Sequence, residues 1–241
     1  VNTPPDADGF SDLQYVMAVV EKIAEKMEDS KIIVTKSTVP VGTANLIKTA
    51  VEETLAEREK KIDFQVASNP EFLKQGDAVN DFMKPDRIVL GCDDKSAELA
   101  LKSIYAPFNS SQDHCLVLDI KSAELTKYAS NAMLATKISL MNELSQIAER
   151  VDADIDQVRV GIGADSRIGY SFIYPGIGIG GSCFTKDIRA LSKSAKAHGY
   201  DAKILNAVEA VNQAQKKVLI DKILFHFKGD VNGRVFGFWG L

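Results

Sequence analysis

The stretch Lys31-Ile-Ile-Val-Thr-Lys-Ser-Thr-Val-Pro-Val-Gly-Thr43 joins a run of β-branched residues to a turn of serine, threonine, proline and glycine. The β-branched run is typical of a buried strand, and the turn leads into a helical pattern at about 44–59. The alternation continues outward, with strands expected at 64–67, 87–90 and 116–119 and helices at about 11–27 and 96–106. It predicts an α/β fold with a mostly parallel sheet, in which ligands bind at the carboxyl ends of the strands.

The pattern becomes helical after Lys121. Apolar residues recur at helical spacing from Ser122 to Arg150, and at about 1.5 Å per residue the predicted helix is roughly 40 Å long. A small domain does not need such a helix for its own core, so we expect it to bridge domains or subunits. We also expect helices at 184–198 and 203–227 and a terminal strand at 234–241.

A second informative stretch is Pro175-Gly-Ile-Gly-Ile-Gly-Gly-Ser-Cys-Phe-Thr-Lys-Asp187. Its glycines allow close approach of a ligand to the backbone. Cys183 falls where a helix is expected to begin, and the helix dipole there favours a thiolate. Lys186 and Asp187 follow at helical spacing, so they lie on the side of the cysteine. Because the Asp187 carboxylate disfavours a nearby thiolate, it suits a later step that positions or deprotonates water. We interpret this stretch as the centre of an active site.

Composition excludes several classes of protein. The net charge of -4 gives no reason to expect nucleic acid or an anionic membrane as a partner. No apolar run approaches the roughly 18 residues of a membrane span, and no signal peptide opens the chain, so we expect a cytoplasmic protein. Cys92 and Cys115 border predicted strands and are typical of small buried residues. Neither a disulfide framework nor a metal site is expected.

Other candidate residues follow from spacing. Lys127 and Asn131 are four residues apart and share one face of the long predicted helix. Thr38 and Glu71 each follow the end of a predicted strand. Taken singly, these residues also fit a solvated helix face, an edge position and a turn.

Six motifs occur in a fixed order: Lys36-Ser-Thr-Val-Pro-Val-Gly-Thr43, Ser68-Asn-Pro-Glu-Phe-Leu73, Pro85-Asp-Arg-Ile-Val-Leu-Gly91, Glu124-Leu-Thr-Lys-Tyr-Ala-Ser-Asn131, Arg167-Ile-Gly169 and Gly178-Ile-Gly-Gly-Ser-Cys-Phe-Thr-Lys-Asp187. Together they resemble the UDP-glucose 6-dehydrogenase family, within the wider UDP-glucose/GDP-mannose dehydrogenase family. The resemblance runs over the whole chain, and the form of the last motif is most similar to the UDP-glucose branch.

The resemblance implies an NAD-dependent, four-electron oxidation of the sugar's C6 alcohol to a carboxylate. Two NAD molecules would be used in turn, and UDP-glucose would become UDP-glucuronate. Cys183 would capture the intermediate aldehyde as a thiohemiacetal, and the thioester formed from it would be hydrolysed. Lys127 and Asn131 would stabilise the negative oxygen that develops.

The remaining roles are also carried over from the family. Glu71, Thr38 and Asp187 match the residues that handle protons and hydrolytic water. The substrate-binding positions correspond to Glu71, Phe72, Leu73, Lys127, Asn131, Phe172, Gly176 and Gly180. The cofactor-binding positions correspond to Thr3, Pro4, Ser37, Thr38, Glu71, Cys183 and Lys186. Where much of the family has a second glutamate, this chain has Gln75, which cannot act as a base.

The family architecture consists of two Rossmann-like domains, one for NAD and one for UDP, joined by a helical section that forms a homodimer. On this basis residues 1–120 are the second half of the NAD-binding domain. Residues 121–228 are the helical dimerisation domain with the Cys183 loop, and residues 229–241 begin the UDP-binding domain. We expect a fragment, because the Gly-rich NAD turn and most of the UDP domain have no counterpart in this sequence.

Two alternatives stay open. The same chemistry could act on GDP-mannose or UDP-N-acetylmannosamine, because the contacts that select the sugar lie largely outside this chain. The chain by itself could also be a non-catalytic dimerisation and binding core, since it has no Gly-x-Gly-x-x-Gly turn between a strand and a helix.

Overall fold

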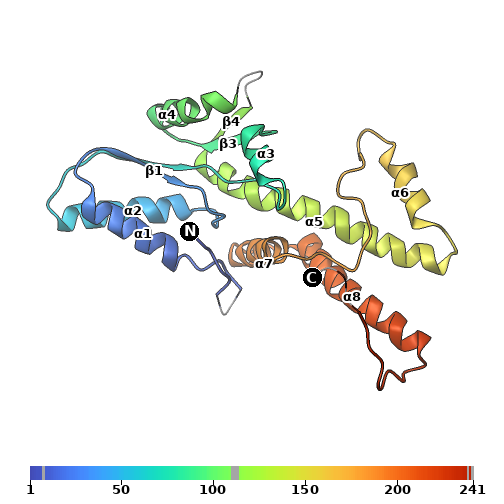
Figure 1. Ribbon diagram of the computed structural model, residues 1–241. Helices are drawn as coiled ribbons and strands as arrows, with labels where there is room; N and C mark the ends of the chain where they lie inside the picture. The colour runs from blue at the N-terminus through green and yellow to red at the C-terminus, as the bar shows by residue number, and fades with distance from the viewer. Residues whose placement is uncertain (7–8, 110–113, 238, 240–241) are drawn as a thin grey trace. The chain divides into compact units, whose positions relative to one another are not determined.

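The computed structural model describes residues 1–6, 9–109, 114–237 and 239, apart from the side chains of Ser182 and Cys183. The chain forms two compact units. The first consists of Val1–Asn131 with Lys186–Asp201, and the second of Ala132–Thr185 with Ala202–Leu241. Figure 1 shows the elements in chain order, from blue to red.

The first unit is built on a four-stranded sheet in the order β1-β2-β3-β4. The strands are β1 (Lys31–Thr35), β2 (Phe64–Ser68), β3 (Ile88–Gly91) and β4 (Cys115–Leu118). The pairs β1/β2 and β3/β4 are parallel, whereas β2 and β3 pair antiparallel at Ser68 and Gly91. The α/β fold with a mostly parallel sheet is therefore confirmed.

Helices cover both faces of this sheet. Figure 1 shows α1 (Gln14–Lys26) and α2 (Thr43–Glu57) together on one side of β1, and α4 (Lys95–Tyr105) beside β3 and β4 on the other side. The short helices α3 (Ala78–Met83) and η1 (Ala106–Phe108) lie in connecting segments and were not expected from periodicity. Six residues and three residues are too short for a helical apolar pattern to stand out.

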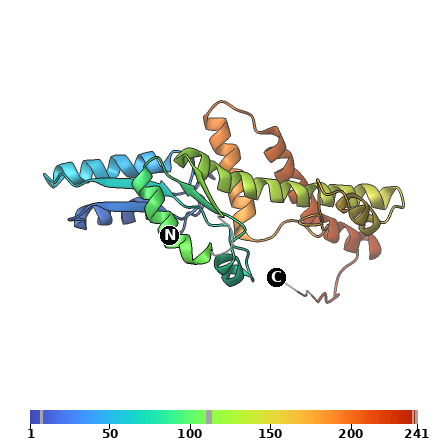
Figure 2. The same ribbon diagram turned by 90° about the horizontal axis from the view of Figure 1, so that it is seen from above.

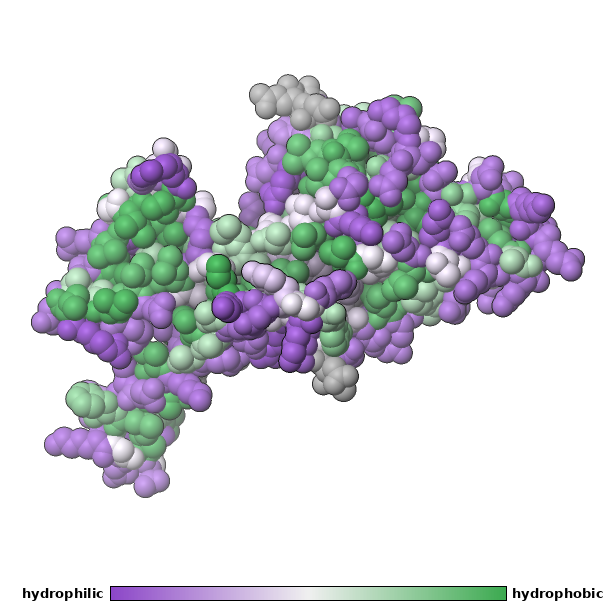
Figure 3. Space-filling view, turned by 180° about the vertical axis from the view of Figure 1, so that it is seen from behind, coloured by the Kyte–Doolittle hydropathy of each residue, from purple (hydrophilic) through white to green (hydrophobic). Residues whose placement is uncertain are grey.

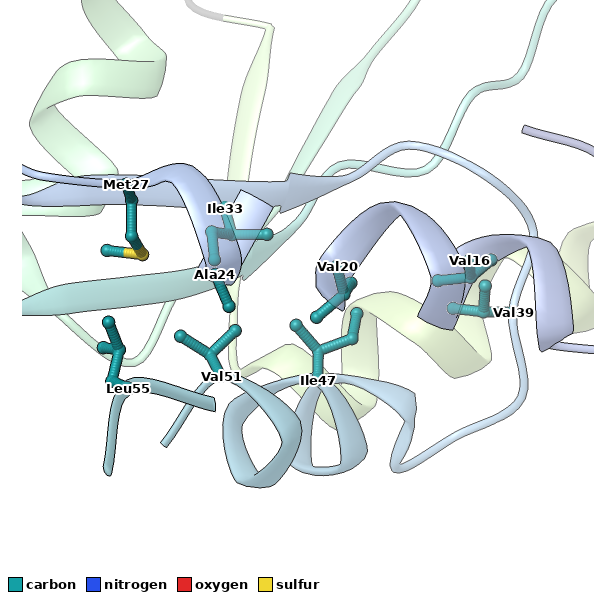
Figure 4. Packing of buried hydrophobic residues seen from close by; sticks show 9 residues of the cluster. All are labelled: Val16, Val20, Ala24, Met27, Ile33, Val39, Ile47, Val51 and Leu55. Carbon is teal, nitrogen blue, oxygen red and sulfur yellow. The ribbon is translucent and has the colours of Figure 1, made fainter. Parts of the chain in front are cut away.

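The main core of this unit is an apolar cluster between α1, α2 and β1, shown in Figure 4. Its buried members are Val16, Val20, Ala24, Met27, Ile33, Val39, Ile47, Val51 and Leu55. On β1, Ile33 points into the cluster while Ile32 and Val34 stay partly exposed. The alternation follows from the period of two along a strand.

Helix α5 (Ile120–Arg150) is the longest element, with 31 residues, and Figure 2 shows it as one uninterrupted helix. Its first turn lies against the end of β3. A Cβ added to Gly91 would lie 2.6 Å from the Cβ of Ala123, so only a glycine permits this approach. The helix predicted at 122–150 is confirmed.

A buried carboxylate ties α5 to the start of α2. Glu124 is 2 % exposed, and its two oxygens accept hydrogen bonds from the backbone N–H groups of Gly42, at 2.6 Å, and Ala44, at 2.9 Å. These N–H groups lie at the N-terminal end of α2, where a helix lacks internal acceptors and favours negative charge. Glu124 thus fixes the turn after β1 against α5.

The second unit is helical. It contains the remainder of α5 with α6 (Ile155–Gly163) and α8 (Lys203–His226), and α7 (Ser182–Ala197) begins in it. Ser139 of α5 donates a hydrogen bond to the carbonyl oxygen of Val208 in α8, at 3.4 Å. Of the strand predicted at 234–241, residues 234–237 and 239 form none, since no partner completes its hydrogen bonds within the described residues, and residues 238, 240 and 241 lie outside the described part of the structure. Among the described residues, no helix is long and apolar enough to cross a bilayer.

The buried side chain of Glu124, which accepts hydrogen bonds from Gly42 and Ala44, makes the free energy of unfolding depend on pH. Burial raises the pKa of the Glu124 carboxyl above its usual 4.5, although hydrogen bonds from Gly42 and Ala44 lower it. Because the folded state holds this proton more tightly than the unfolded chain, stabilisation by Glu124 is complete below the unfolded pKa and declines as pH rises through the folded pKa. Glu124→Gln does not titrate, so the free energy of unfolding of the wild type relative to this variant should fall as pH rises from below 4.5 to neutral.

Urea unfolding of both proteins, followed by circular dichroism across that pH range, measures this difference. Glu52→Gln, at an exposed position of α2, is the matched control for the same change of side chain. A difference between wild type and Glu124→Gln that stays constant or grows with pH would contradict the assignment.

Candidate active site

In the first unit, α5 and α7 bring two candidate residues into direct contact. Asn131 donates a hydrogen bond from Nδ2 to Oδ2 of Asp187, at 2.6 Å. Asn131 is 8 % exposed and Asp187 is 2 % exposed. A carboxylate this deeply buried needs partners to offset its desolvation, and the Asn131 amide is one of them.

Lys186 supplies the second partner and extends the cluster. Its Nζ lies 3.0 Å from Oδ1 of Asp187 and donates a hydrogen bond to Oγ1 of Thr3, at 3.4 Å. Although it makes this ion pair, Oδ1 has no hydrogen bond of good geometry within the described residues, so the attraction is mainly electrostatic. Thr3 in turn donates to the carbonyl oxygen of Thr38, at 2.9 Å. Interactions therefore run from α7 to the turn after β1.

Lys127 lies one helical turn before Asn131 on α5. Its Nζ is 3.5 Å from Oε2 of Glu71, and the lysine side chain is only 11 % exposed. Oε1 of Glu71 accepts a hydrogen bond from the backbone N–H of Leu73, at 2.8 Å. The Phe72 ring lies 5.1 Å from Lys127 Nζ, within the range of a cation–π interaction. The segment after β2 thus presents Glu71, Phe72 and Leu73 to α5.

Two further residues of this region were not singled out from the sequence. The guanidinium carbon of Arg87 lies 4.2 Å from the Phe72 ring centroid, and Arg87 donates a hydrogen bond to Oγ of Ser130, at 3.1 Å. Tyr128 exchanges a hydrogen bond with Ser11 at 3.1 Å, and burial raises the pKa of its hydroxyl to about 12. Both residues lie inside motifs of the sequence, but their partners are distant along the chain.

The other cofactor candidates lie near the carboxyl end of β1. Ser37 donates a hydrogen bond to the carbonyl oxygen of Val1, at 2.7 Å, and the carbonyl oxygen of Pro4 accepts one from the N–H of Asp12, at 2.7 Å. Thr38 joins the cluster through its backbone oxygen. Gln75 is exposed.

The remaining candidates belong to the second unit. Phe172 has a positive φ of 62°, a conformation uncommon for residues other than glycine. The N–H of Gly176 donates a hydrogen bond to Oδ1 of Asn142, at 2.7 Å, whereas Gly180 is exposed. The backbone of Cys183 is in the first turn of α7, and its side chain lies outside the described part of the structure.

The titratable side chains in the described ranges form no group suited to a metal ion. The first unit instead offers a lysine next to a glutamate and a buried amide next to an aspartate. Such a set can stabilise a developing negative oxygen and position water.

Two domains of one protein family match this sequence. The NAD-binding domain of the UDP-glucose/GDP-mannose dehydrogenase family matches residues 1–109, and the central domain of the same family matches residues 121–214.

Curated relatives and a solved structure agree with this match. The UDP-glucose 6-dehydrogenase of Pseudomonas aeruginosa is 47% identical over 100% of this chain and 53% of its own length. The UDP-glucose 6-dehydrogenase TuaD of Bacillus subtilis is 43% identical over 100% of this chain and 51% of its own. A UDP-glucose dehydrogenase structure from Pyrobaculum islandicum superposes with a TM-score of 0.88 at 39% identity, over 95% of this chain and 52% of that one.

The chain spans about half the length of these relatives, 53% and 51% in the two curated cases. Within that span both family domains occur in the same order, and together they account for most of the sequence. The chain belongs to the UDP-glucose/GDP-mannose dehydrogenase family.

Proposed function

We propose that this chain carries the sugar-oxidising residues of a UDP-glucose 6-dehydrogenase, an NAD-dependent oxidoreductase that converts UDP-glucose to UDP-glucuronate. The observation that carries the proposal is the buried pair of Asn131 and Asp187, with Lys127 one turn away on α5. Asp187 belongs to α7, the helix whose first turn contains Cys183. The names of the relatives, which are 47% and 43% identical, favour UDP-glucose as the substrate.

The residues present fit NAD as the cofactor. The parallel strands β1 and β2 end in register at Thr35 and Ser68, and ligands bind outside such carboxyl ends. The Thr3 hydroxyl lies at this edge, because it donates to Thr38, and Lys186 brings a positive charge to Thr3. Hydroxyl and ammonium donors suit the phosphate and amide oxygens of a dinucleotide. NAD, when bound, accepts two electrons and a proton in each of the two oxidations.

In the first oxidation, the C6 alcohol loses its hydroxyl proton as the aldehyde forms. Glu71 receives or relays that proton, and the role is supported by its partly exposed carboxylate, which lies 3.5 Å from Lys127 Nζ. The Lys127 ammonium, nearly buried, stabilises negative charge on the C6 oxygen, and the Asn131 amide donates to the same oxygen.

Cys183 then holds the aldehyde. Its sulfur adds to the aldehyde carbon, a C–S bond forms, and the oxygen takes up a proton to give a thiohemiacetal. In the second oxidation this adduct gives up the hydride of C6, which the second NAD would accept, and the hydroxyl proton, and it becomes a thioester. A helix N-terminus favours the thiolate that the addition requires, and Cys183 is the second residue of α7.

The last step is hydrolysis. Water adds to the thioester carbon, the acyl C–S bond breaks with the Cys183 thiolate as leaving group, and the carboxylate product forms while the protons of the water are released. Asp187 positions and deprotonates this water, because its carboxylate lies one helical turn after Cys183 and is held by Asn131 and Lys186.

We further propose that residues 1–120 are the second half of the NAD-binding domain and 121–228 the central domain, and that the protein is a homodimer through α5. Hydrophobic side chains are visible as green areas on the face shown in Figure 3. On α5 of the second unit, apolar residues more than half exposed recur at intervals of seven, at Met133, Leu140 and Ile147, and the exposed Val151 follows directly after the helix. A second copy of this helix would bury such a stripe. The cytoplasmic location stays a prediction from the sequence.

Oxidation of GDP-mannose or UDP-N-acetylmannosamine by the same residues is the second candidate function. The family description names GDP-mannose beside UDP-glucose. Lys127, Asn131, Cys183 and Asp187 act on the C6 group, which all three sugars can present, so these residues do not select among them.

The four-electron mechanism predicts the stoichiometry of the full-length protein. Each UDP-glucose consumed should give about two NADH, because the aldehyde is held until the second oxidation. Cys183→Ser should lower steady-state turnover by roughly 1,000-fold or more, since loss of a covalent nucleophile has effects of this order. Absorbance of NADH and quantification of the sugar product measure both.

Cys92→Ser is the matched control and should retain activity, because Cys92 lies at the end of β3 outside the candidate site. One NADH per sugar, or unchanged turnover in Cys183→Ser, would contradict the covalent mechanism. Faster turnover of GDP-mannose or UDP-N-acetylmannosamine than of UDP-glucose would favour the second candidate function.

The role of Asp187 predicts an accumulating intermediate. In Asp187→Asn the amide cannot accept a proton from water, so thioester hydrolysis should slow by roughly 100-fold or more. Mass spectrometry of the denatured protein after mixing with UDP-glucose and NAD should then show a sugar adduct on Cys183. The control Asp221→Asn, at an exposed position of α8, should show none. Absence of the adduct in Asp187→Asn with turnover like that of the wild type would refute this role.

The exposed stripe on α5 predicts the oligomeric state. Leu140→Lys places a charge in the centre of the proposed interface, where desolvation without a partner is costly, and should convert the dimer to a monomer. Sedimentation equilibrium distinguishes the two states. Gln213→Lys on α8 is the control and should remain dimeric. A wild-type monomer, or a Leu140→Lys dimer of equal stability, would contradict the proposed interface.

A further inference from the structure

Three carboxamide side chains of the second unit bind the backbone of the loop that precedes α7. Asn142, on α5, accepts a hydrogen bond at Oδ1 from the N–H of Gly176, at 2.7 Å. Gln215, on α8, donates from Nε2 to the carbonyl oxygen of the same glycine, at 2.7 Å. Asn212 accepts at Oδ1 from the N–H of Ile179, at 2.6 Å. These hydrogen bonds replace the backbone partners that a strand or helix would provide.

The three carboxamides lie inside the unit, while the loop lies at its surface. Asn142 is 0 % exposed, Asn212 is 4 % exposed and Gln215 is 7 % exposed, whereas Ile177 is 68 % exposed. Hydrogen bonds in such buried positions are stronger than in water, because water does not compete for the partners. The buried carboxamides therefore bind the inner side of the loop, and its outer side remains exposed to solvent.

The side chain of Asn142 lowers the stability of the folded state through one unpaired group. Its Nδ2 has no hydrogen-bond partner among the described residues, although the side chain is fully buried. An unpaired buried amide group destabilises the folded state, and a leucine of similar size would not carry this penalty. The carboxamide at this position thus serves the loop rather than the stability of the helices.

Gly178 lies directly against these side chains. Its φ is 111°, and an added Cβ would be 3.0 Å from Oδ1 of Asn212 and 3.1 Å from Cγ of Lys216. Both the backbone conformation and the close approach require a glycine. The loop conformation is consequently restricted at three residues, by hydrogen bonds at Gly176 and Ile179 and by close packing at Gly178.

We propose that Asn142, Asn212 and Gln215 are positioning residues that hold the loop at 176–179 and thereby fix the entry of the chain into α7. The proposal rests on the proposed function, because it assigns the purpose of the loop to the placement of Cys183. Ile179 is 4 % exposed and is anchored by Asn212 four residues before Cys183. Misplacement of a reacting group by about 1 Å can cost 100-fold in rate.

Gln215→Met and Asn142→Leu, made in the full-length protein, test this arrangement. Methionine keeps the length of Gln215 but cannot donate, and leucine fills the position of Asn142 but cannot accept. Amide hydrogen exchange of the peptide containing 176–179 should accelerate about tenfold in each variant, the factor expected from one net hydrogen bond. In each variant, kcat with UDP-glucose should fall by about 10- to 100-fold.

A purely structural role predicts a different result for Asn142→Leu. If the carboxamide stabilised the helices, the variant would melt at a lower temperature, whereas positioning of the loop predicts an equal or higher melting temperature together with faster exchange. Gln213→Met, an equivalent change at an exposed position of α8, should alter neither exchange nor kcat.

Unchanged exchange at 176–179 in both variants would overturn the proposal whether or not the protein is a dehydrogenase. Faster exchange with an unchanged kcat would overturn the link to Cys183. If the wild type forms no NADH with any of the three sugar nucleotides, the proposed function fails and the link to Cys183 fails with it. The exchange measurement then still decides whether the carboxamides hold the loop.

Discussion

The hydrogen bonds from Gly42 and Ala44 to the buried carboxylate of Glu124 set the position of α5 in the first unit. A carboxylate that accepts two N–H groups at a helix N-terminus can adopt few orientations. These two bonds therefore restrict both the rotation of α5 about its axis and its position along that axis relative to α2. Lys127 and Asn131 follow at intervals of three and four residues, on turns whose places are then determined. Together with the packing of Ala123 on Gly91, this anchor places α5 where Lys127 lies 3.5 Å from Glu71 and Asn131 lies 2.6 Å from Asp187.

In this unit, apolar packing mainly stabilises the fold, whereas polar contacts fix the positions of individual side chains. The cluster around Ile47 and Val51 supplies non-directional stabilisation and tolerates small shifts of α1 and α2. Hydrogen bonds to buried groups do not tolerate such shifts, because their energy falls steeply with distance and angle. A site that must hold Asn131 and Asp187 at 2.6 Å is therefore organised by buried polar groups, although these contribute less to stability than the core.

The same principle operates in the second unit, where carboxamides from α5 and α8 bind a loop with little side-chain volume of its own. Gly176, Gly178 and Gly180 offer no side chain for apolar contacts, so hydrogen bonds to the backbone supplement the buried side chain of Ile179 in fixing the loop. Amide side chains can accept and donate at once and carry no net charge, which makes them suitable partners in a buried position.

Much of this protein follows from the sequence alone. The β-branched run at 32–34 predicted a strand, the period of 3.6 along 122–150 predicted the long helix, and the alternation of strands and helices predicted the α/β class. The family motifs identified Lys127, Asn131 and Asp187 before any contact was known. Only the tertiary structure decided that β2 and β3 run antiparallel, that Arg87 stacks on Phe72, and that Asn142 meets Gly176. These pairings join residues far apart in the chain, and local periodicity carries no information about which distant groups will satisfy one another's hydrogen bonds and charges.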